Sequence, residues 1–167
     1  MNFSKSAGRR RGFTLIELLI VIVVIAILAL IVIPRVMSAG RKARESTLKA
    51  NLHQLRNAIE TFQADCGLYP VEMMDLTLLK SAPPANGIDD ENATQIIPLG
   101  SYQGPYLSVT GGIGTTGIPT NPFKSPQDAD YGDENAHWDY GTEGPGIVRA
   151  AYPPEGETLD GVPYSEL

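Results

Sequence analysis

The longest apolar stretch in the chain runs from Phe13 to Ile33, and Glu17 is the only charged residue among its 21 positions. As a helix rising about 1.5 Å per residue, this segment is long enough to cross a hydrocarbon core of roughly 30 Å. The pattern therefore predicts a membrane-spanning helix. Because a proline removes one helical hydrogen bond and clashes with the preceding turn, we expect the helix to be kinked or loosened at Pro34.

A second helical pattern begins near Arg41, where apolar residues recur at spacings of four, three, four, three and four positions. Such spacing is typical of a helix with one apolar face. Gly67 is well placed to end it. Together the two patterns predict a nearly continuous helix over residues 13–66, roughly 80 Å long, whose second half packs on a sheet formed by the rest of the chain. The apolar face consists of Leu48, Leu52, Leu55, Ile59, Phe62 and Cys66.

The remaining residues are rich in glycine and proline. They predict a short helix over residues 72–80 and a solvated loop over 81–94. The tail from Pro153 is acidic and irregular, and no structure is predicted for it. Short strands are expected over residues 106–109, 137–140 and 147–152, the last two forming a β-hairpin around a glycine-rich loop.

Charge is unevenly distributed along the chain. The chain carries 13 basic and 19 acidic residues, and four of the basic residues precede Phe13, so the net charge of −6 becomes −10 without them. The helical stretch 35–56 is basic and has Glu45 as its only acid. This basic belt suits contact with acidic surface on a stacked copy of the chain, or with anionic lipid headgroups. Its six basic residues are Arg35, Arg41, Lys42, Arg44, Lys49 and Arg56.

Glu17 is the feature that a plain membrane anchor does not explain. An ionised carboxylate inside a membrane-spanning helix is costly unless it has a partner, which indicates a functional role. If the chain were cut after Gly12, the new α-amine of Phe13 would lie one helical turn from Glu17 and could face that carboxylate on a neighbouring copy. A secretory signal peptide would have a shorter apolar region without an acid. An ordinary single-pass anchor accounts for the length but not for the acid.

The N-terminal part of the chain resembles the type IV prepilin family. The resemblance rests on the residues from Gly12 to Glu17, the three preceding arginines, the apolar run and Pro34. The segment 65–70 resembles the region after the long helix in the major pseudopilins of type II secretion, and 118–123 resembles their C-terminal region. The resemblance implies a pilin-like α+β fold, with the long N-terminal helix packed on a small antiparallel β-sheet. The expected divisions are a leader at 1–12, a membrane and polymerisation helix at 13–34, an amphipathic helix at 35–66 and a globular region at 67–167.

The same resemblance implies how the chain works. A prepilin peptidase would cleave between Gly12 and Phe13, Phe13 would be N-methylated, and Glu17 would align the subunit against the next one. Its partners would be further copies of itself, the inner-membrane assembly platform and minor pilins or pseudopilins. The C-terminal domain would lie in the periplasm, anchored in the bacterial inner membrane before assembly into a periplasmic or surface filament.

Cys66 is the only cysteine, so the chain cannot form an intramolecular disulfide. Many pilins of the surface-fibre type close a C-terminal loop with a disulfide, so the chain looks more like a major pseudopilin. We expect Cys66 to be a small buried apolar residue.

Acidic loops near the C-terminus raise the question of a metal, although no cofactor is required by the predicted function. Asp128, Asp130 and Asp133 place carboxylates in one glycine-containing loop, and Asp160 begins a second candidate loop. Calcium prefers such oxygen ligands, and major pseudopilins commonly bind it in C-terminal loops. The alternative is a solvated acidic loop without a metal.

Enzymatic chemistry has little support in the sequence. His53 and His137 are the only histidines, and neither a nucleophile elbow nor a phosphate-binding loop is present. An acidic exposed domain also argues against nucleic-acid binding. The sequence therefore predicts a structural filament subunit of a type II secretion system. The alternatives are a true type IV pilin for motility, adhesion or DNA uptake, and a membrane-anchored periplasmic binding or enzymatic domain.

Overall fold

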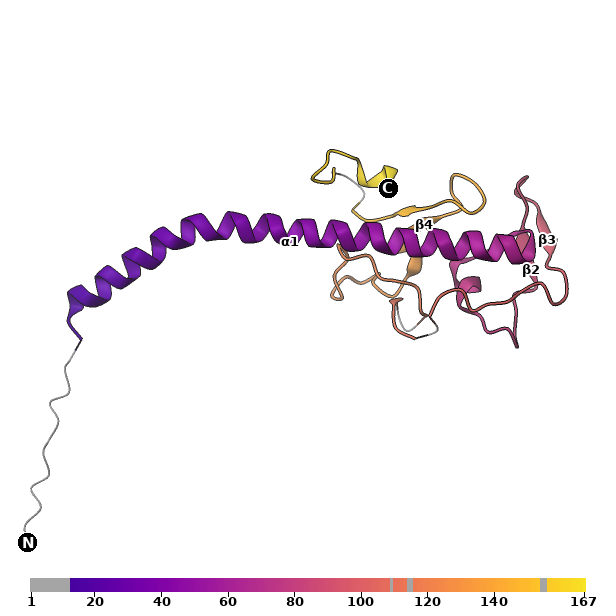
Figure 1. Cartoon of the computed structure of the whole chain (residues 1–167), viewed down its shortest axis with the longest axis horizontal. Helices are drawn as coiled ribbons and strands as arrows, with labels where there is room; N and C mark the ends of the chain where they lie inside the picture. Colours follow the sequence, from indigo (N-terminus) through magenta and orange to yellow (C-terminus); the bar gives the residue numbers. More distant parts are fainter. Residues whose placement is uncertain (1–12, 109, 114–115, 154–155) are drawn as a thin grey trace, which may run out of the picture. The chain divides into compact units, whose positions relative to one another are not determined.

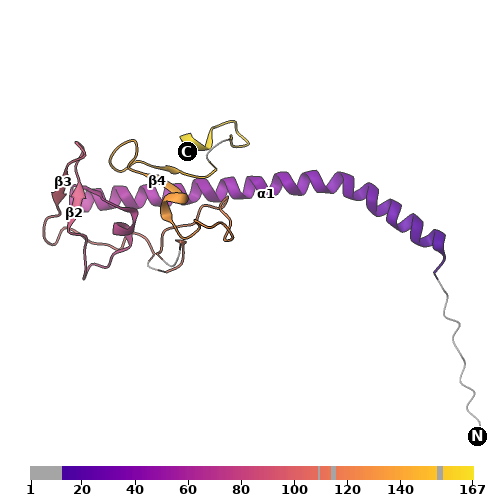
Figure 2. The same cartoon turned by 180° about the vertical axis from the view of Figure 1, so that it is seen from behind.

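The computed structural model describes residues 13–108, 110–113, 116–153 and 156–167. The chain divides into two compact units, Met1–Arg41 and Lys42–Leu167. Helix α1, Leu15–Cys66, contributes 52 residues and belongs in part to each unit (Figures 1 and 2). The expected long helix is therefore present, two residues shorter at its start than predicted.

In the first unit, α1 continues through Pro34 and Gly40 without a break. One missing hydrogen bond does not end a helix whose other backbone groups remain paired, and prolines are tolerated within apolar helices for this reason. The helix therefore does not end at Pro34, and the kink or loosening expected there stays a prediction.

In the second unit, the apolar face of α1 is buried as its spacing predicted. All six residues of the stripe, from Leu48 to Cys66, are at most 4% exposed. Loops and short strands cover them and add Met73, Leu76, Ile118 and Trp138 to the same core. Gly67 ends the helix with a φ of 71°, a left-handed conformation that favours glycine, and its N–H donates to the carbonyl of Gln63 at 2.7 Å.

A small antiparallel sheet lies just beyond the C-terminal end of α1 (Figures 1 and 2). Its strands are β1, Tyr69–Pro70, β2, Asn86–Ile88, and β3, Thr94–Ile96, in the order β1-β2-β3. In the register of β2 and β3, Ile88 pairs with Thr94. The prediction of a solvated loop over 81–94 was therefore wrong for residues 86–88 and 94, because strands of two or three residues are too short to show an alternating pattern.

The turn between β2 and β3 is held by one side chain. The Asp89 carboxylate accepts hydrogen bonds from the N–H groups of Glu91 at 3.0 Å and Ala93 at 2.8 Å. Asn92 has a φ of 63°, which asparagine tolerates better than most residues. The acidic run that suggested a solvated loop is thus the tip of a hairpin.

The predicted C-terminal hairpin is present. Strands β4, Trp138–Tyr140, and β5, Val148–Ala150, pair antiparallel, with Trp138 opposite Ala150. Trp138 is fully buried and its indole N–H donates to the carbonyl of Pro119 at 2.7 Å. The fold is α+β, with two small antiparallel sheets on the second half of one long helix.

Two local predictions differ from the structure. The predicted helix over 72–80 is a 3₁₀ helix, η1, Met73–Thr77. Residues 106–108 form no strand, because the N–H groups of Tyr106 and Leu107 both donate to the carbonyl of Leu76, at 2.8 and 3.0 Å. Residue 109, the last of that predicted strand, lies outside the described residues.

Three aromatic rings join these loops to α1. Phe62 meets Tyr102 and Tyr106 edge to face, with ring centroids 5.8 and 5.7 Å apart. The Tyr102 hydroxyl donates to the carbonyl of Leu78 at 2.6 Å. Burial raises the pKa of Tyr102 to about 12, so its hydroxyl remains a donor at all physiological pH values.

Candidate assembly sites

Thr14 and Glu17 form a capping box at the start of α1. The backbone N–H and the hydroxyl of Thr14 both donate to Oε2 of Glu17, each at 2.8 Å, and the N–H of Glu17 donates to the Thr14 hydroxyl at 3.3 Å. The carboxylate therefore has a partner within its own chain. Reasoning from the sequence missed this role of Thr14, although a threonine three residues before a glutamate at a helix start predicts a capping box.

The predicted cleavage point lies between Gly12 and Phe13, and the structure describes only Phe13. Gly12 lies outside the described residues. Phe13 immediately precedes the capping box and is 79% exposed. Cleavage after Gly12, N-methylation of Phe13 and a role for Pro34 in assembly stay predictions.

The apolar part of α1 is uncovered in the single chain. Every large apolar side chain from Phe13 to Met37 is at least 48% exposed. Among the described residues, α1 is the one helix long and apolar enough to cross a membrane by its length and composition. Because so much continuous apolar surface is unfavourable in water, it requires lipid or another apolar surface to cover it.

Glu45, the only acid of the basic belt, is almost completely buried at 5% exposure. Its carboxylate accepts the N–H of Leu159 at 3.1 and 3.0 Å and the hydroxyl of Tyr164 at 2.9 Å. Nearby, Lys49 forms an ion pair with Asp160 at 3.0 Å. The acidic tail, for which the sequence predicted no structure, is thus fastened to α1 by a buried carboxylate.

A second buried polar group fastens the hairpin. Asn121 is 1% exposed, and its amide donates to the carbonyls of His137, at 3.2 Å, and Tyr152. His137 is fully buried and its Nδ1 accepts the N–H of Asn121 at 3.0 Å, while its Nε2 lies 2.9 Å from the carbonyl of Tyr131. Both imidazole nitrogens therefore have partners inside the fold, which is a structural role for His137.

The four calcium candidates are each engaged with protein groups. Asp128 accepts the N–H of Ser125, Asp133 that of Asn135, and Asp130 pairs with Lys124 at 2.8 Å. Asp160, on the other loop, pairs with Lys49. Within the part of the chain that the structure describes, no three His, Cys, Asp or Glu side chains are grouped to hold a metal ion. Calcium binding stays a prediction.

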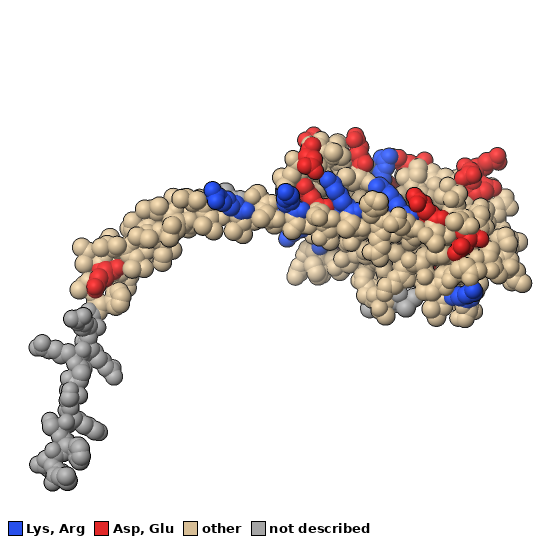
Figure 3. All heavy atoms as spheres, in the orientation of Figure 1, with Lys and Arg blue, Asp and Glu red and all other residues tan. Residues whose placement is uncertain are grey.

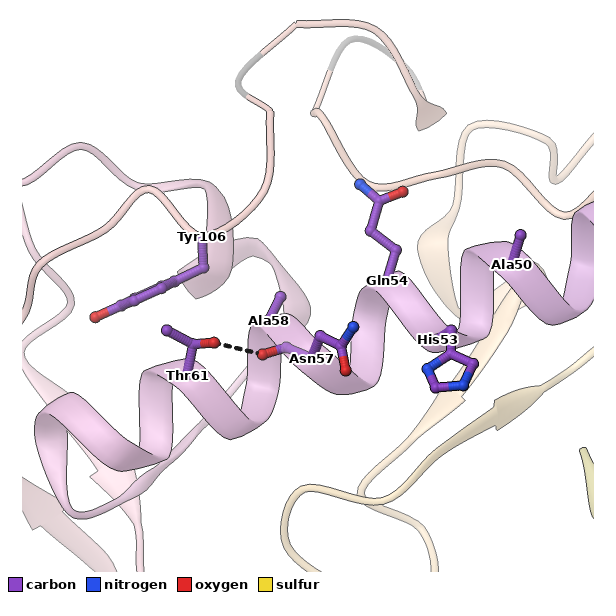
Figure 4. A pocket seen from close by; sticks show the side chains of 7 residues that line it. All are labelled: Ala50, His53, Gln54, Asn57, Ala58, Thr61 and Tyr106. Carbon is purple, nitrogen blue, oxygen red and sulfur yellow. Dashed lines mark hydrogen bonds between the residues drawn. The ribbon is translucent and has the colours of Figure 1, made fainter.

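An open groove of about 680 Å³ follows an uncovered side of α1 (Figure 4). Figure 4 shows its side chains spread over successive helical turns without converging on one point. Its lining contains one imidazole, from His53, and one phenol, from Tyr106, and it has no carboxylate or thiol. The groove therefore offers a contact surface and no pair of groups placed for acid–base or nucleophilic chemistry.

Charged side chains of both signs occur in the second unit. Figure 3 shows several basic side chains in a row along the helix, and acidic side chains mixed with a few basic ones over the rest of the unit. Part of the basic belt has partners within the chain: Lys49 forms an ion pair with Asp160, and Arg56 donates a hydrogen bond to the carbonyl of Val148 at 3.1 Å. Lys42 and Arg44 are exposed, and no ion pair to either occurs among the described residues.

Two protein families match parts of the chain. The family described as "Prokaryotic N-terminal methylation motif" matches residues 8–33, which include the capping box. The family described as "Type II secretion system (T2SS), protein G" matches residues 35–118, half of the chain. The chain belongs to the type II secretion system protein G family. The resemblance to major pseudopilins is thereby confirmed.

Individual relatives of this protein G family member include core proteins G and a pilus component. The chain is 30% identical over 112 residues to a type II secretion system core protein G of Escherichia coli, covering 65% of this chain and 77% of that protein. It is 38% identical over 77 residues to the core protein G of Klebsiella pneumoniae, covering 46% of this chain and 55% of that protein. A type IV wide pilus major component of Thermus thermophilus is 41% identical over 75 residues, with coverage of 44% and 57%. No solved structure matches the chain.

Proposed function

We propose that this chain is the major structural subunit of a type II secretion pseudopilus. The observation that supports this most directly is the uncovered apolar part of α1, whose single acid is capped by its own chain. In a filament, neighbouring copies cover this surface after the subunit leaves the lipid. The work of the protein is mechanical, and its surface carries no group that we assign to catalysis.

The capping box suggests how Glu17 is tolerated before assembly. Both Thr14 donors point at one carboxylate oxygen, so part of the charge is satisfied while the subunit is still in the membrane. Processing after Gly12 then adds the α-amine of Phe13, which pairs with Glu17 of a neighbouring copy. In this scheme the chain crosses the inner membrane once, with its globular unit in the periplasm. A prepilin peptidase, an assembly platform and minor pseudopilins are its partners.

The test begins with the mass of the N-terminal peptide of protein isolated from native membranes. We expect a peptide that starts at N-methylated Phe13. An intact Met1 terminus in cells with an active prepilin peptidase would contradict processing and leave a membrane-anchored domain as the function.

Substitution of Glu17 then tests assembly. Glu17→Val should be inserted in the membrane but should not form filaments, because no charge remains to align it with the amine of its neighbour. Glu17→Asp is the matched control, since it keeps the charge and should retain part of the assembly. A Glu17→Val protein that supports full function would indicate a membrane-anchored binding or enzymatic domain instead.

A surface pilus is the second candidate, favoured by the similarity to the Thermus thermophilus wide pilus component. The two functions differ in what deletion of the gene removes. Loss of secretion into the medium without loss of a surface fibre supports the pseudopilus. Loss of a long surface fibre seen by microscopy, with secretion intact, supports the pilus.

A further inference from the structure

An exposed apolar patch lies at the edge of the β1-β2-β3 sheet. Strand β3 is the edge strand, and all three of its residues are exposed. Ile96 is 81% exposed, and Leu99, just beyond the strand, is fully exposed. Single exposed apolar residues are common, but two large ones, one on an edge strand and one just beyond it, form a surface that is suited to contact.

The turn beside this patch is acidic. Asp90 and Glu91 are exposed at its tip, and neither has an ion-pair partner within the described ranges. A hydrogen bond from the N–H of Ala93 lowers the pKa of the neighbouring Asp89 from its usual value. We refer to Asp90, Glu91, Ile96 and Leu99 as the hairpin patch.

The opposite charge lies at the other end of the same unit. Lys42 and Arg44 are exposed on the first turn of α1 within this unit, and α1 ends near the sheet at Cys66. Cys66 lies 22 positions after Arg44, which separates the two surfaces by about 33 Å along the helix. Lys42 and Arg44 have long aliphatic stems. These stems can cover apolar side chains while the charged ends contact carboxylates. We refer to these two residues as the helix basic pair.

The growth of a filament requires two different surfaces on every copy. A contact between identical surfaces closes a dimer, whereas a contact between two different surfaces repeats without end. The hairpin patch and the helix basic pair are different, opposite in charge and at opposite ends of one unit. They therefore meet the requirement for contact between copies displaced along the filament.

We infer that the hairpin patch of one subunit docks on the helix basic pair of a second copy of this chain. The contact rests on the proposed filament function and adds a longitudinal interaction between globular units to the packing of the apolar helices. Charge complementarity selects the register of the contact, and burial of Ile96 and Leu99 under the two aliphatic stems stabilises it.

Charge reversal tests this contact in the full-length protein. Glu91→Lys and Arg44→Glu should each lower the recovery of sheared filaments about tenfold, because like charges then face each other at every interface. The double variant carrying both changes should recover most of the wild-type yield. Glu60→Lys, a reversal at an exposed position elsewhere on α1, is the matched control and should assemble normally.

Cysteine cross-linking tests proximity directly. Arg44→Cys and Glu91→Cys are placed in two differently tagged copies and expressed together. A mixed dimer should form on oxidation of the filaments, and neither variant should cross-link to itself. Cys66 does not interfere, since it is 4% exposed.

The outcomes separate this contact from the filament function. If the wild type forms filaments and Glu91→Lys assembles normally, the proposed docking is wrong and the proposed filament function is unaffected. Absence of wild-type filaments overturns both. A defect in Arg44→Glu that the double variant does not rescue, with weaker binding to phosphatidylglycerol vesicles, also overturns the docking and assigns the helix basic pair to lipid headgroups.

Discussion

Removing the carboxylate of Glu45 should release the C-terminal segment from α1. The side chain is 5% exposed and accepts hydrogen bonds from Leu159 and Tyr164. A hydrogen bond to a charged group contributes about 1.5–3 kcal/mol. Two such bonds set an upper value of roughly 3–6 kcal/mol, and rehydration of the released segment lowers it. We therefore expect Glu45→Ala to reduce the free energy of unfolding by about 2–4 kcal/mol.

Two further variants show whether the buried carboxylate is the cause. Glu45→Gln keeps one oxygen acceptor but replaces the other oxygen with an amide NH₂, which cannot accept from Leu159 or Tyr164. We therefore expect the free energy of unfolding to fall by about 1–2 kcal/mol. Lys49→Ala breaks the neighbouring exposed ion pair with Asp160, and a change within about 0.5 kcal/mol is expected.

Urea unfolding of the full chain in detergent measures these differences. Trp138 is the only tryptophan and is fully buried, so its fluorescence reports loss of the core. Hydrogen exchange at the Leu159 amide reports release of the segment itself. The reasoning fails if Glu45→Ala unfolds at the same urea concentration as the wild type and the Leu159 amide remains equally protected.

Four other outcomes follow from the same structure. Leu55→Ala should lower the free energy of unfolding by about 2–5 kcal/mol in urea titration, while membrane fractionation shows normal insertion. Asn121→Ala should cost about 2–3 kcal/mol, since it removes the side-chain donor to the carbonyl of Tyr152 and one of the two donors to the carbonyl of His137, and full stability would contradict this. Burial, with the negative charges of Glu72, Asp133 and Asp75, raises the pKa of Glu134. Its charged form therefore opposes folding at neutral pH, and Glu134→Gln should stabilise by a few tenths of a kcal/mol at pH 7, a gain that disappears as the pH falls below about 4.5. Calcium binding predicts a higher melting temperature in calcium than in chelator, and equal temperatures would remove that hypothesis.

The long helix and its burial could be read from the sequence. The run from Phe13 to Ile33 predicted the apolar part of α1, and the spacing from Leu48 to Cys66 predicted its buried face. Both are local patterns, since helical periodicity depends only on residues three or four positions apart. The β4–β5 hairpin was predictable for a similar reason, because its strands are neighbours joined by a glycine-rich turn.

The tertiary structure alone decided where the irregular segments lie. The β2–β3 hairpin could not be predicted, because its strands of three residues carry no periodic signal. The pattern over 106–109 predicts a strand, but the N–H groups of Tyr106 and Leu107 donate to the carbonyl of Leu76. In both cases the backbone partner is supplied by the surrounding fold.

The polar contacts depended most strongly on the tertiary structure. Glu45 contacts residues 114 and 119 positions away, and Asn121 joins His137 to Tyr152. A sequence shows the residue types but not which distant pairs meet, so a buried carboxylate looked like one acid in a basic belt. Thr14 and Glu17 are three residues apart, and their capping box was determined by the sequence itself because its geometry is local.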